Sequence, residues 1–303
     1  MEQVSVDFPL SPEQIEHRKR LVNELKKNPR VIEFIRSQNL NESVIEERAQ
    51  MFSDWLSHQK PCVNCLGLSV CTQSKTGFAL GIETQPLWTW ELQACRYQKA
   101  HDALTAHRAY YVYNDAADHF LEASLDHLLD QNPEPSYMAS IKPMVDWFNK
   151  PTQKGFYFYG LPGTGKTHLA CAMANYFAKQ AKKVAVVHVP SLALRFPTSY
   201  SDETKEIVLQ QLKKAYFVVF DDIGAETYTS YFRDEILFPL LNSRMEDKKL
   251  TVFTSNHSLD ALKNHFRYNQ KADDESVKSM RLMERIQALS QALQVGGSNR
   301  RDR

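Results

Sequence analysis

The chain has 303 residues, 43% of them hydrophobic and 24% charged, enough apolar content for one sizeable core and a second, smaller one. Its formal net charge of +1 excludes a general electrostatic attraction to nucleic acid or to membranes, so such partners would need local patches. The N-terminus lacks a signal-peptide pattern and no run of about 18 apolar residues occurs, which predicts a cytoplasmic protein without membrane contact. In that reducing compartment the five cysteines favour metal binding over disulfides.

The N-terminal third is predicted to be helical at first and then to change character. A capping-box pattern at Ser11 begins a charged helix that runs to about Lys27. A second helix is predicted from Ile45 to His58, with apolar side chains available for burial. Residues 60–100 instead carry cysteines, glycines and two tryptophans, the composition of a small domain that needs a stabilising cross-link to stay folded.

Strands and helices alternate in the rest of the chain. Strands are predicted at 156–159, 183–190, 216–220 and 250–254, with helices after the first two. This alternation is typical of an α/β fold with a parallel sheet and helices on both faces. We therefore expect three segments, a small helical domain, a linker and an α/β domain, at 1–105, 106–135 and 136–303.

A glycine-rich stretch joins the first of these strands to the helix after it. It runs from Gly160 to Thr167 and matches the phosphate-binding pattern G-x-x-x-x-G-K-[ST]. Glycines let backbone amides approach a phosphate, Lys166 reaches the terminal phosphates, and the Thr167 hydroxyl can ligate Mg²⁺. The alternative, a chance glycine-rich turn, is disfavoured by the flanking strand and helix. The residues predicted to bind nucleotide are Gly160, Pro162, Gly163, Thr164, Gly165, Lys166, Thr167 and His168.

Two further strands end in polar side chains. The strand at 216–220 runs into Asp221, which would hold Mg²⁺ through water, and Asp222, which would polarise the attacking water. The strand at 250–254 leads to Asn256, whose amide would reach the γ-phosphate or the water if the two strands are neighbours. Each of these residue types is also common in ordinary turns, so the evidence for a nucleotide site comes from their order along the chain.

Two arginines four residues apart, Arg281 and Arg285, share one face of a predicted helix. The planar fork of arginine suits phosphate oxygens, and such a residue can complete the site of a neighbouring subunit. A solvent-exposed charged face, with Glu284 as partner, is the alternative interpretation.

Across about residues 150–290 these motifs, in this order, resemble the DnaC, DnaI and IstB branch of the AAA+ ATPases. The resemblance implies ATP hydrolysis with Mg²⁺, in which Asp221 and Asp222 form the Walker B motif, Asn256 is sensor 1, and Arg285 is the arginine finger. Many AAA+ proteins have Glu in place of Asp222, and the shorter acid predicts slow hydrolysis, stimulated by a partner or DNA. Only 18 residues, 286–303, follow Arg285, too few for the helical lid of larger AAA+ proteins. Assembly should then depend on neighbouring subunits.

Four cysteines gather within 34 residues of the N-terminal domain, whereas Cys171 lies apart. Four thiolates suit a tetrahedral, structural zinc site, and buried free thiols are the alternative. The cluster resembles that of DnaI-type helicase loaders, which can use histidine, so His58 or His101 could replace one cysteine. The predicted zinc ligands are Cys62, Cys65, Cys71 and Cys95.

The resemblance further implies an ATP-dependent loader that delivers the hexameric replicative helicase onto single-stranded DNA during primosome assembly, in replication initiation or restart. The N-terminal domain would bind the helicase, and the ATPase domain would bind the DNA and form a homo-oligomer with ATP. The candidate DNA contacts are Arg195, Phe196, Lys205, Lys213, Lys214, Arg300, Arg301 and Arg303. The alternative is that these charges only keep the surface of the domain hydrated. An IstB-like transposition helper ATPase, a small-molecule kinase and a nucleotide-regulated adaptor are the alternative functions.

Overall fold

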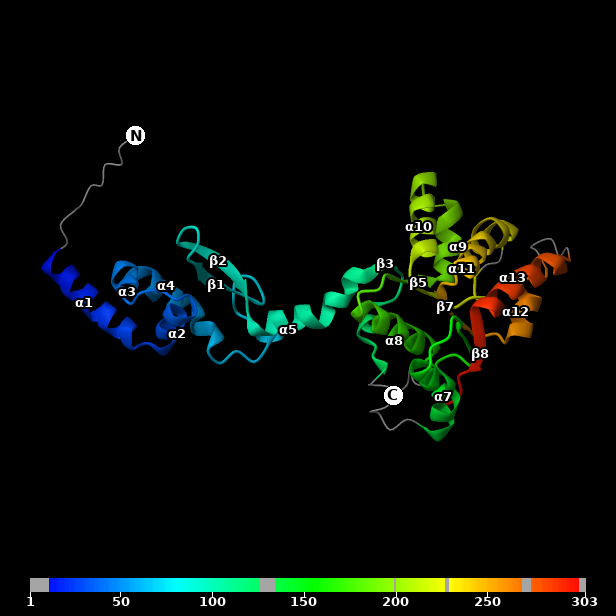
Figure 1. Cartoon of the computed structure of the whole chain (residues 1–303), viewed down its shortest axis with the longest axis horizontal. Helices are drawn as coiled ribbons and strands as arrows, with labels where there is room; N and C mark the ends of the chain where they lie inside the picture. Colours follow the sequence, from blue (N-terminus) through cyan, green and yellow to red (C-terminus); the bar gives the residue numbers. More distant parts are fainter. Residues whose placement is uncertain (1–10, 126–133, 199, 227–228, 269–273, 300–303) are drawn as a thin grey trace. The chain divides into compact units, whose positions relative to one another are not determined.

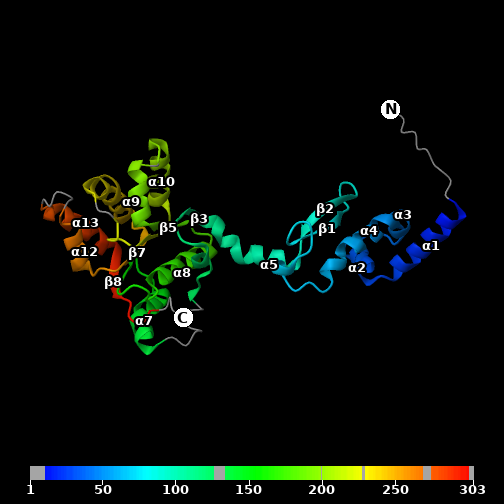
Figure 2. The ribbon, with the colours of Figure 1, turned by 180° about the vertical axis from the view of Figure 1, so that it is seen from behind.

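The structure, a computed structural model, describes residues 11–125, 134–198, 200–226, 229–268 and 274–299. The chain divides into two compact units, Met1–Thr105 and Ala106–Arg303. Each unit can be followed by its colours in Figures 1 and 2. Within the described ranges, no helix is both long and apolar enough to cross a bilayer. The candidate DNA contacts Arg300, Arg301 and Arg303 lie outside the described residues.

The first unit combines helices with one antiparallel hairpin. Its elements are α1 (Pro12–Lys27), α2 (Pro29–Ser37), α3 (Ser43–Glu47), α4 (Ala49–Gln59), β1 (Phe78–Glu83), β2 (Thr89–Ala94) and α5 (Arg96–Thr105). The predicted capping box is confirmed, because the Gln14 N–H donates to Ser11 Oγ at 3.2 Å and the Ser11 N–H donates to Gln14 Oε1 at 2.8 Å. The single helix predicted over 45–58 is wrong, because the backbone leaves helical geometry at Arg48 between α3 and α4.

A small apolar core holds this unit together. Val31 of α2 and Phe52 of α4 are fully buried, and Ile82 of β1 joins them. The Phe52 ring meets the Trp88 ring edge to face, with centroids 6.0 Å apart. The hairpin is therefore packed against the helices through aromatic side chains.

The second unit is built on a six-stranded sheet in which every pairing is parallel. Its strands are β3 (Tyr111–Asn114), β4 (Gly155–Tyr159), β5 (Val184–His188), β6 (Phe217–Asp221), β7 (Leu250–Ser255) and β8 (Ser290–Gln294). Their order across the sheet is β3-β5-β6-β7-β4-β8. The predicted α/β fold with a parallel sheet is confirmed.

Helices cover both faces of the sheet (Figure 1). They are α7 (Pro135–Asn149), α8 (Lys166–Lys179), α9 (Val189–Thr198), α10 (Asp202–Lys214), α11 (Phe238–Glu246), α12 (Leu259–His265) and α13 (Ser276–Leu289), and a π-helical turn, Phe232–Leu237, leads into α11. Successive strand residues point to opposite faces: Phe156 and Phe158 pack with α7 and α8, whereas Tyr157 packs with the helices of the other face. The central strands are buried on both sides, which explains their continuous apolar runs.

Two edge strands were absent from the sequence prediction. Strand β3 lies inside the segment 106–135 that was predicted as a linker, yet it pairs with β5 and belongs to the sheet. It is anchored on α8, where the Tyr111 hydroxyl donates to Asn175 Oδ1 at 2.6 Å. Strand β8 is mostly exposed and polar, so it lacks the apolar run by which the central strands were recognised.

Candidate nucleotide-binding site

The glycine-rich loop lies between β4 and α8, at the carboxyl edge of the sheet. Gly160, Gly163 and Gly165 have φ angles of +148°, +81° and +94°, which side chains rarely tolerate. Gly165 is the N-cap of α8, so the free amides of the first helical turn lie at the loop. This arrangement is suited to binding an anion such as phosphate.

Lys166 connects this loop to the neighbouring strand β7. Its Nζ donates to the carbonyl oxygens of Gly160 at 3.0 Å and Leu161 at 2.9 Å, and to Asn256 Oδ1 at 2.9 Å. Because β7 lies between β6 and β4, the residue that follows it is placed beside the loop. The structure thus brings together Lys166 and Asn256, which are 90 residues apart in sequence.

The Asp221 carboxylate is buried between two threonine hydroxyls. Thr167 Oγ1 donates to Asp221 Oδ1 at 2.8 Å, and Thr254 Oγ1 donates to the same oxygen at 2.6 Å. Burial raises the pKa of Asp221 above its ordinary value, and the hydrogen bonds from Thr254 and Thr167 oppose that shift. Thr167 and Asp221, the predicted magnesium ligands, are therefore in direct contact.

Asp222 is half-exposed and has a left-handed backbone, with φ at +56°. Its N–H donates to Thr254 Oγ1 at 2.9 Å, which holds the strained residue in place. Its Oδ2 lies 3.8 Å from Nε2 of His188, whose Nδ1 is 2.7 Å from Ser191 Oγ. The acid predicted to polarise water thus faces an imidazole that a hydrogen bond to α9 orients.

Comparisons with known proteins agree with this geometry. Residues 138–303 match the family described as IstB-like ATP binding protein. The chain belongs to the IstB-like ATP binding protein family. The resemblance to the DnaC, DnaI and IstB branch of the AAA+ ATPases, inferred from the motifs, is therefore confirmed.

Several proteins that are similar to this chain are named as replicative helicase loaders. The chain is 38% identical over 172 residues to the replicative helicase loader DnaI of Bacillus subtilis, covering 55% of each chain. It is 29% identical over 109 residues to the replicative helicase loader DnaC of Escherichia coli K12, covering 35% of this chain and 44% of that one. A crystal structure of DnaI superimposes with a TM-score of 0.53 at 30% identity, covering 61% of this chain and 96% of that chain. The chain spans about half the length of the curated relatives that it matches.

The Arg285 side chain is held by contacts with α11 and with its own helix, α13. Its Nε donates to Asn242 Oδ1 at 3.1 Å, its Nη1 pairs with Glu284 at 3.0 Å, and its guanidinium lies 5.2 Å from the centre of the Phe238 ring. These contacts hold the side chain between α13 and α11.

The four clustered cysteines line one cavity of about 380 Å³ in the first unit. The backbone N–H groups of Gly77 and Gln98 each lie 3.5 Å from a sulfur, those of Cys71 and Cys95 respectively. Hydrogen bonds from the Gly77 and Gln73 backbones lower the pKa of Cys71, which favours its thiolate. No three histidine, cysteine or carboxylate side chains in the described part of the chain are spaced so that they could hold a metal ion as they stand.

The candidate DNA contacts differ in their exposure. Phe196 is fully buried in the core, so the prediction that its ring stacks on bases is wrong. Arg195 pairs with Asp115 at 2.6 Å and donates to the Tyr113 hydroxyl at 2.9 Å. Lys205 pairs with Asp202 at 3.0 Å on the surface of α10. Among the described candidates, Lys214 is exposed, whereas Arg195, Lys205 and Lys213 are partly buried.

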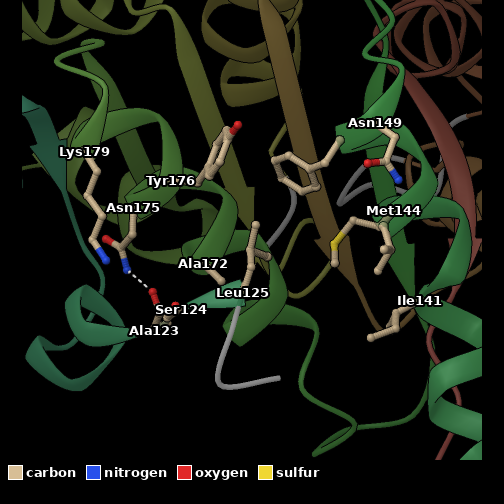
Figure 3. Close-up of a pocket in the computed structure, with 12 residues that line it drawn as sticks. Ala123, Ser124, Leu125, Ile141, Met144, Asn149, Ala172, Asn175, Tyr176 and Lys179 are labelled. Atoms are coloured by element: carbon tan, nitrogen blue, oxygen red, sulfur yellow. Dashed lines mark hydrogen bonds between the residues drawn. The ribbon is translucent and has the colours of Figure 1, made fainter. Parts of the chain in front are cut away.

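A separate hollow of about 310 Å³ lies beside α7 and the second half of α8. Figure 3 shows Ile141 and Met144 on one side of it, and Asn175, Tyr176 and Lys179 on the other. None of the predicted site residues lines it. It is thus distinct from the phosphate loop.

Sequence reasoning missed two side chains of the nucleotide site. Thr254 was read only as the end of a strand, although its hydroxyl contacts both Asp221 and Asp222. His188 lies at the end of β5, in register with Asp221 of β6. The available signal was the one used for Asn256: a polar residue where a buried parallel strand ends.

Proposed function

We propose that this protein is an ATP-dependent loader that delivers the replicative helicase onto single-stranded DNA during primosome assembly. The observation that carries the proposal is the meeting of Lys166 with Asn256, and of Thr167 with Asp221, at one glycine loop. The relatives DnaI and DnaC, which are replicative helicase loaders, supply the helicase-loading role. The resemblance extends the role to replication initiation and restart.

Each side chain of the site has a task in ATP hydrolysis. Loop amides and Lys166 bind the phosphates, and Asn256 reaches the γ-phosphate once Lys166 has turned toward it. Asp222, whose backbone N–H is bound by Thr254 and whose carboxylate lies near His188, accepts the proton of the attacking water. Thr167 and Asp221 fit Mg²⁺, an oxygen-binding cation that neutralises charge on the phosphates. Hydrolysis is expected to be slow, because the short Asp222 side chain has little reach.

We propose that Cys62, Cys65, Cys71 and Cys95 hold a structural zinc ion in the N-terminal domain. Their shared cavity and the N–H groups directed at two of the sulfurs support this assignment. The metal would secure the turns that carry the cysteines, because this unit has only a small apolar core. His58 or His101 is the alternative ligand to one of the thiolates.

Metal analysis of the purified full chain tests the zinc proposal. We expect about one zinc per chain, as four thiolates form a closed site. The double variant Cys62→Ser/Cys65→Ser should lose the metal, whereas Cys171→Ser, which changes a buried cysteine of α8, should keep it. Less than half an equivalent of zinc in the unmodified protein would contradict the assignment.

Co-purification with the replicative helicase of the same organism tests the loading function. We expect the full chain to retain the helicase, because the N-terminal domain is the proposed contact, and to assemble on single-stranded DNA only with ATP. Lys166→Ala should remove ATP binding and DNA-bound assembly while leaving helicase capture in place. Absence of helicase capture in every nucleotide state would refute the loader assignment and leave the ATPase fold untouched.

A further inference from the structure

The described chain beyond β8 runs back over the phosphate loop. Val295, directly after the strand, donates its N–H to the Tyr159 carbonyl oxygen at 2.8 Å. Its own carbonyl oxygen lies 2.5 Å from the position that a Cβ on Gly160 would occupy. The segment therefore packs directly on the first glycine of the loop.

Four residues later the same segment touches the loop a second time. Asn299 Oδ1 is 1.9 Å, and its Cγ 2.6 Å, from the position of a Cβ on Gly163. The amide of Asn299 thus lies in space that any side chain at position 163 would need. Gly163 is required both for this approach and for its φ of +81°.

The segment is also fastened to α7. Ser298 Oγ donates to Glu134 Oε1 at 2.6 Å, and the Ser298 N–H donates to Glu134 Oε2 at 3.3 Å. Gly297, with φ at +104°, turns the backbone against Tyr137. The position of Asn299 is therefore supported from the loop and from the start of α7.

We propose that residues 296–299 form one wall of the nucleotide site, and that the Asn299 side chain contacts the ribose and base of bound ATP. The amides of the loop and of α8 take the phosphates, which leaves the sugar and base to project beyond the loop. A carboxamide offers both donors and an acceptor, the combination that sugar hydroxyls and base edges require. The inference depends on the proposed ATP binding and adds a contact on the chain's own C-terminal segment.

Equilibrium binding of Mg²⁺–ATP to the full chain, measured by calorimetry, tests this contact. Asn299→Ala should weaken binding roughly 2- to 10-fold, the effect of losing a hydrogen bond. Asn299→Asp keeps the shape that packs on Gly163 but replaces the N–H donors by a negative charge near the phosphates. It should therefore weaken binding more than Asn299→Ala does, an effect that a purely packing role would not produce.

Gln291→Ala, an exposed change on β8, is the matched control and should bind ATP as the unmodified chain does. Ser298→Ala should shift affinity in the same direction as Asn299→Ala, because it releases the segment from Glu134. Unchanged binding by both Asn299 variants, or tighter binding by Asn299→Ala, would overturn this inference alone. Failure of the unmodified chain to bind ATP would instead overturn the proposed function and, with it, the inference.

Discussion

The Asp221 carboxylate shows how single residues at the site favour function over stability. Its Oδ1 accepts hydrogen bonds from Thr167 and Thr254, yet the group is so deeply buried that its pKa is raised above the ordinary value. A charged carboxylate without a cation beside it is costly in such a place. The same charge is what a bound divalent cation requires.

Replacing Asp221 by Asn should therefore stabilise the nucleotide-free protein at pH 7. A carboxyl group whose folded-state pKa is raised contributes a destabilising free energy that grows as the pH rises from the unfolded-state pKa through the folded-state pKa. The gain from Asp221→Asn should thus be largest at neutral pH and disappear near pH 4, where about half of unfolded-state aspartates are protonated. Urea denaturation at the two pH values measures the difference, and Mg²⁺-dependent ATP binding should be lost. Equal stability at pH 7 would contradict the cost assigned to the buried charge.

At the scale of elements, the sheet edge is what brings the site together. Strand β7 contains Thr254 and is followed directly by Asn256, and it lies between the strand of Asp221 and the strand that leads to the loop. A polar residue at the end of each strand therefore reaches its neighbours without any long loop. The strand order decides the geometry, because β4, β6 and β7 are far apart in sequence.

A buried arginine stabilises the opposite edge of the same sheet. Arg244 of α11 is completely buried and donates to the carbonyl oxygens of Leu212, Ala215 and Leu250 and to Thr251 Oγ1, at 2.6 to 3.0 Å. It thus connects α11 with the end of α10 and the start of β7. This connection is structural, since none of these partners belongs to the nucleotide site.

Arg244→Met should destabilise the protein by about 3–5 kcal/mol, because two buried carbonyl oxygens and one partly buried carbonyl oxygen would lose this donor. Chemical denaturation measures the loss. Arg267→Met, which removes an exposed pair with Asp274, is the control and should change the stability little. A loss as small as that of the control would show that the buried network contributes little.

At the scale of the whole molecule, we expect Arg285 to link the nucleotide site to oligomerisation. Its side chain contacts Asn242 and Phe238 of α11. If it serves as an arginine finger, it acts on the ATP of another copy of the chain. ATP hydrolysis should then depend on protein concentration.

Arg285→Ala should leave ATP binding by isolated subunits within about 3-fold, while hydrolysis in the assembled state falls by roughly 10³-fold. Steady-state hydrolysis measured across a range of protein concentrations tests this, and the cooperative rise of the unmodified protein should vanish. Arg281→Ala, an exposed arginine one helical turn earlier, is the matched control. Unchanged cooperativity in Arg285→Ala would place the finger elsewhere.

The sequence alone determined the features that depend on residues close together in the chain, namely local motifs and regular apolar patterns. The loop from Gly160 to Thr167 has a fixed local spacing, and the central strands are continuous apolar runs because both of their faces are buried. The acids and the asparagine follow those strands directly. The fold class, the family and the candidate nucleotide residues could therefore be predicted before any coordinates.

Only the tertiary structure decided the features that depend on contacts between distant segments. The edge strands β3 and β8 each pair with one neighbouring strand and are only partly buried. Their sequences therefore lack the continuous apolar run by which a central strand can be predicted. The contact of His188 with Asp222, the burial of Phe196 and the return of Asn299 to the loop depend on how helices and strands pack. Local residue patterns cannot specify such contacts, since the partners are chosen by the packing of the whole domain.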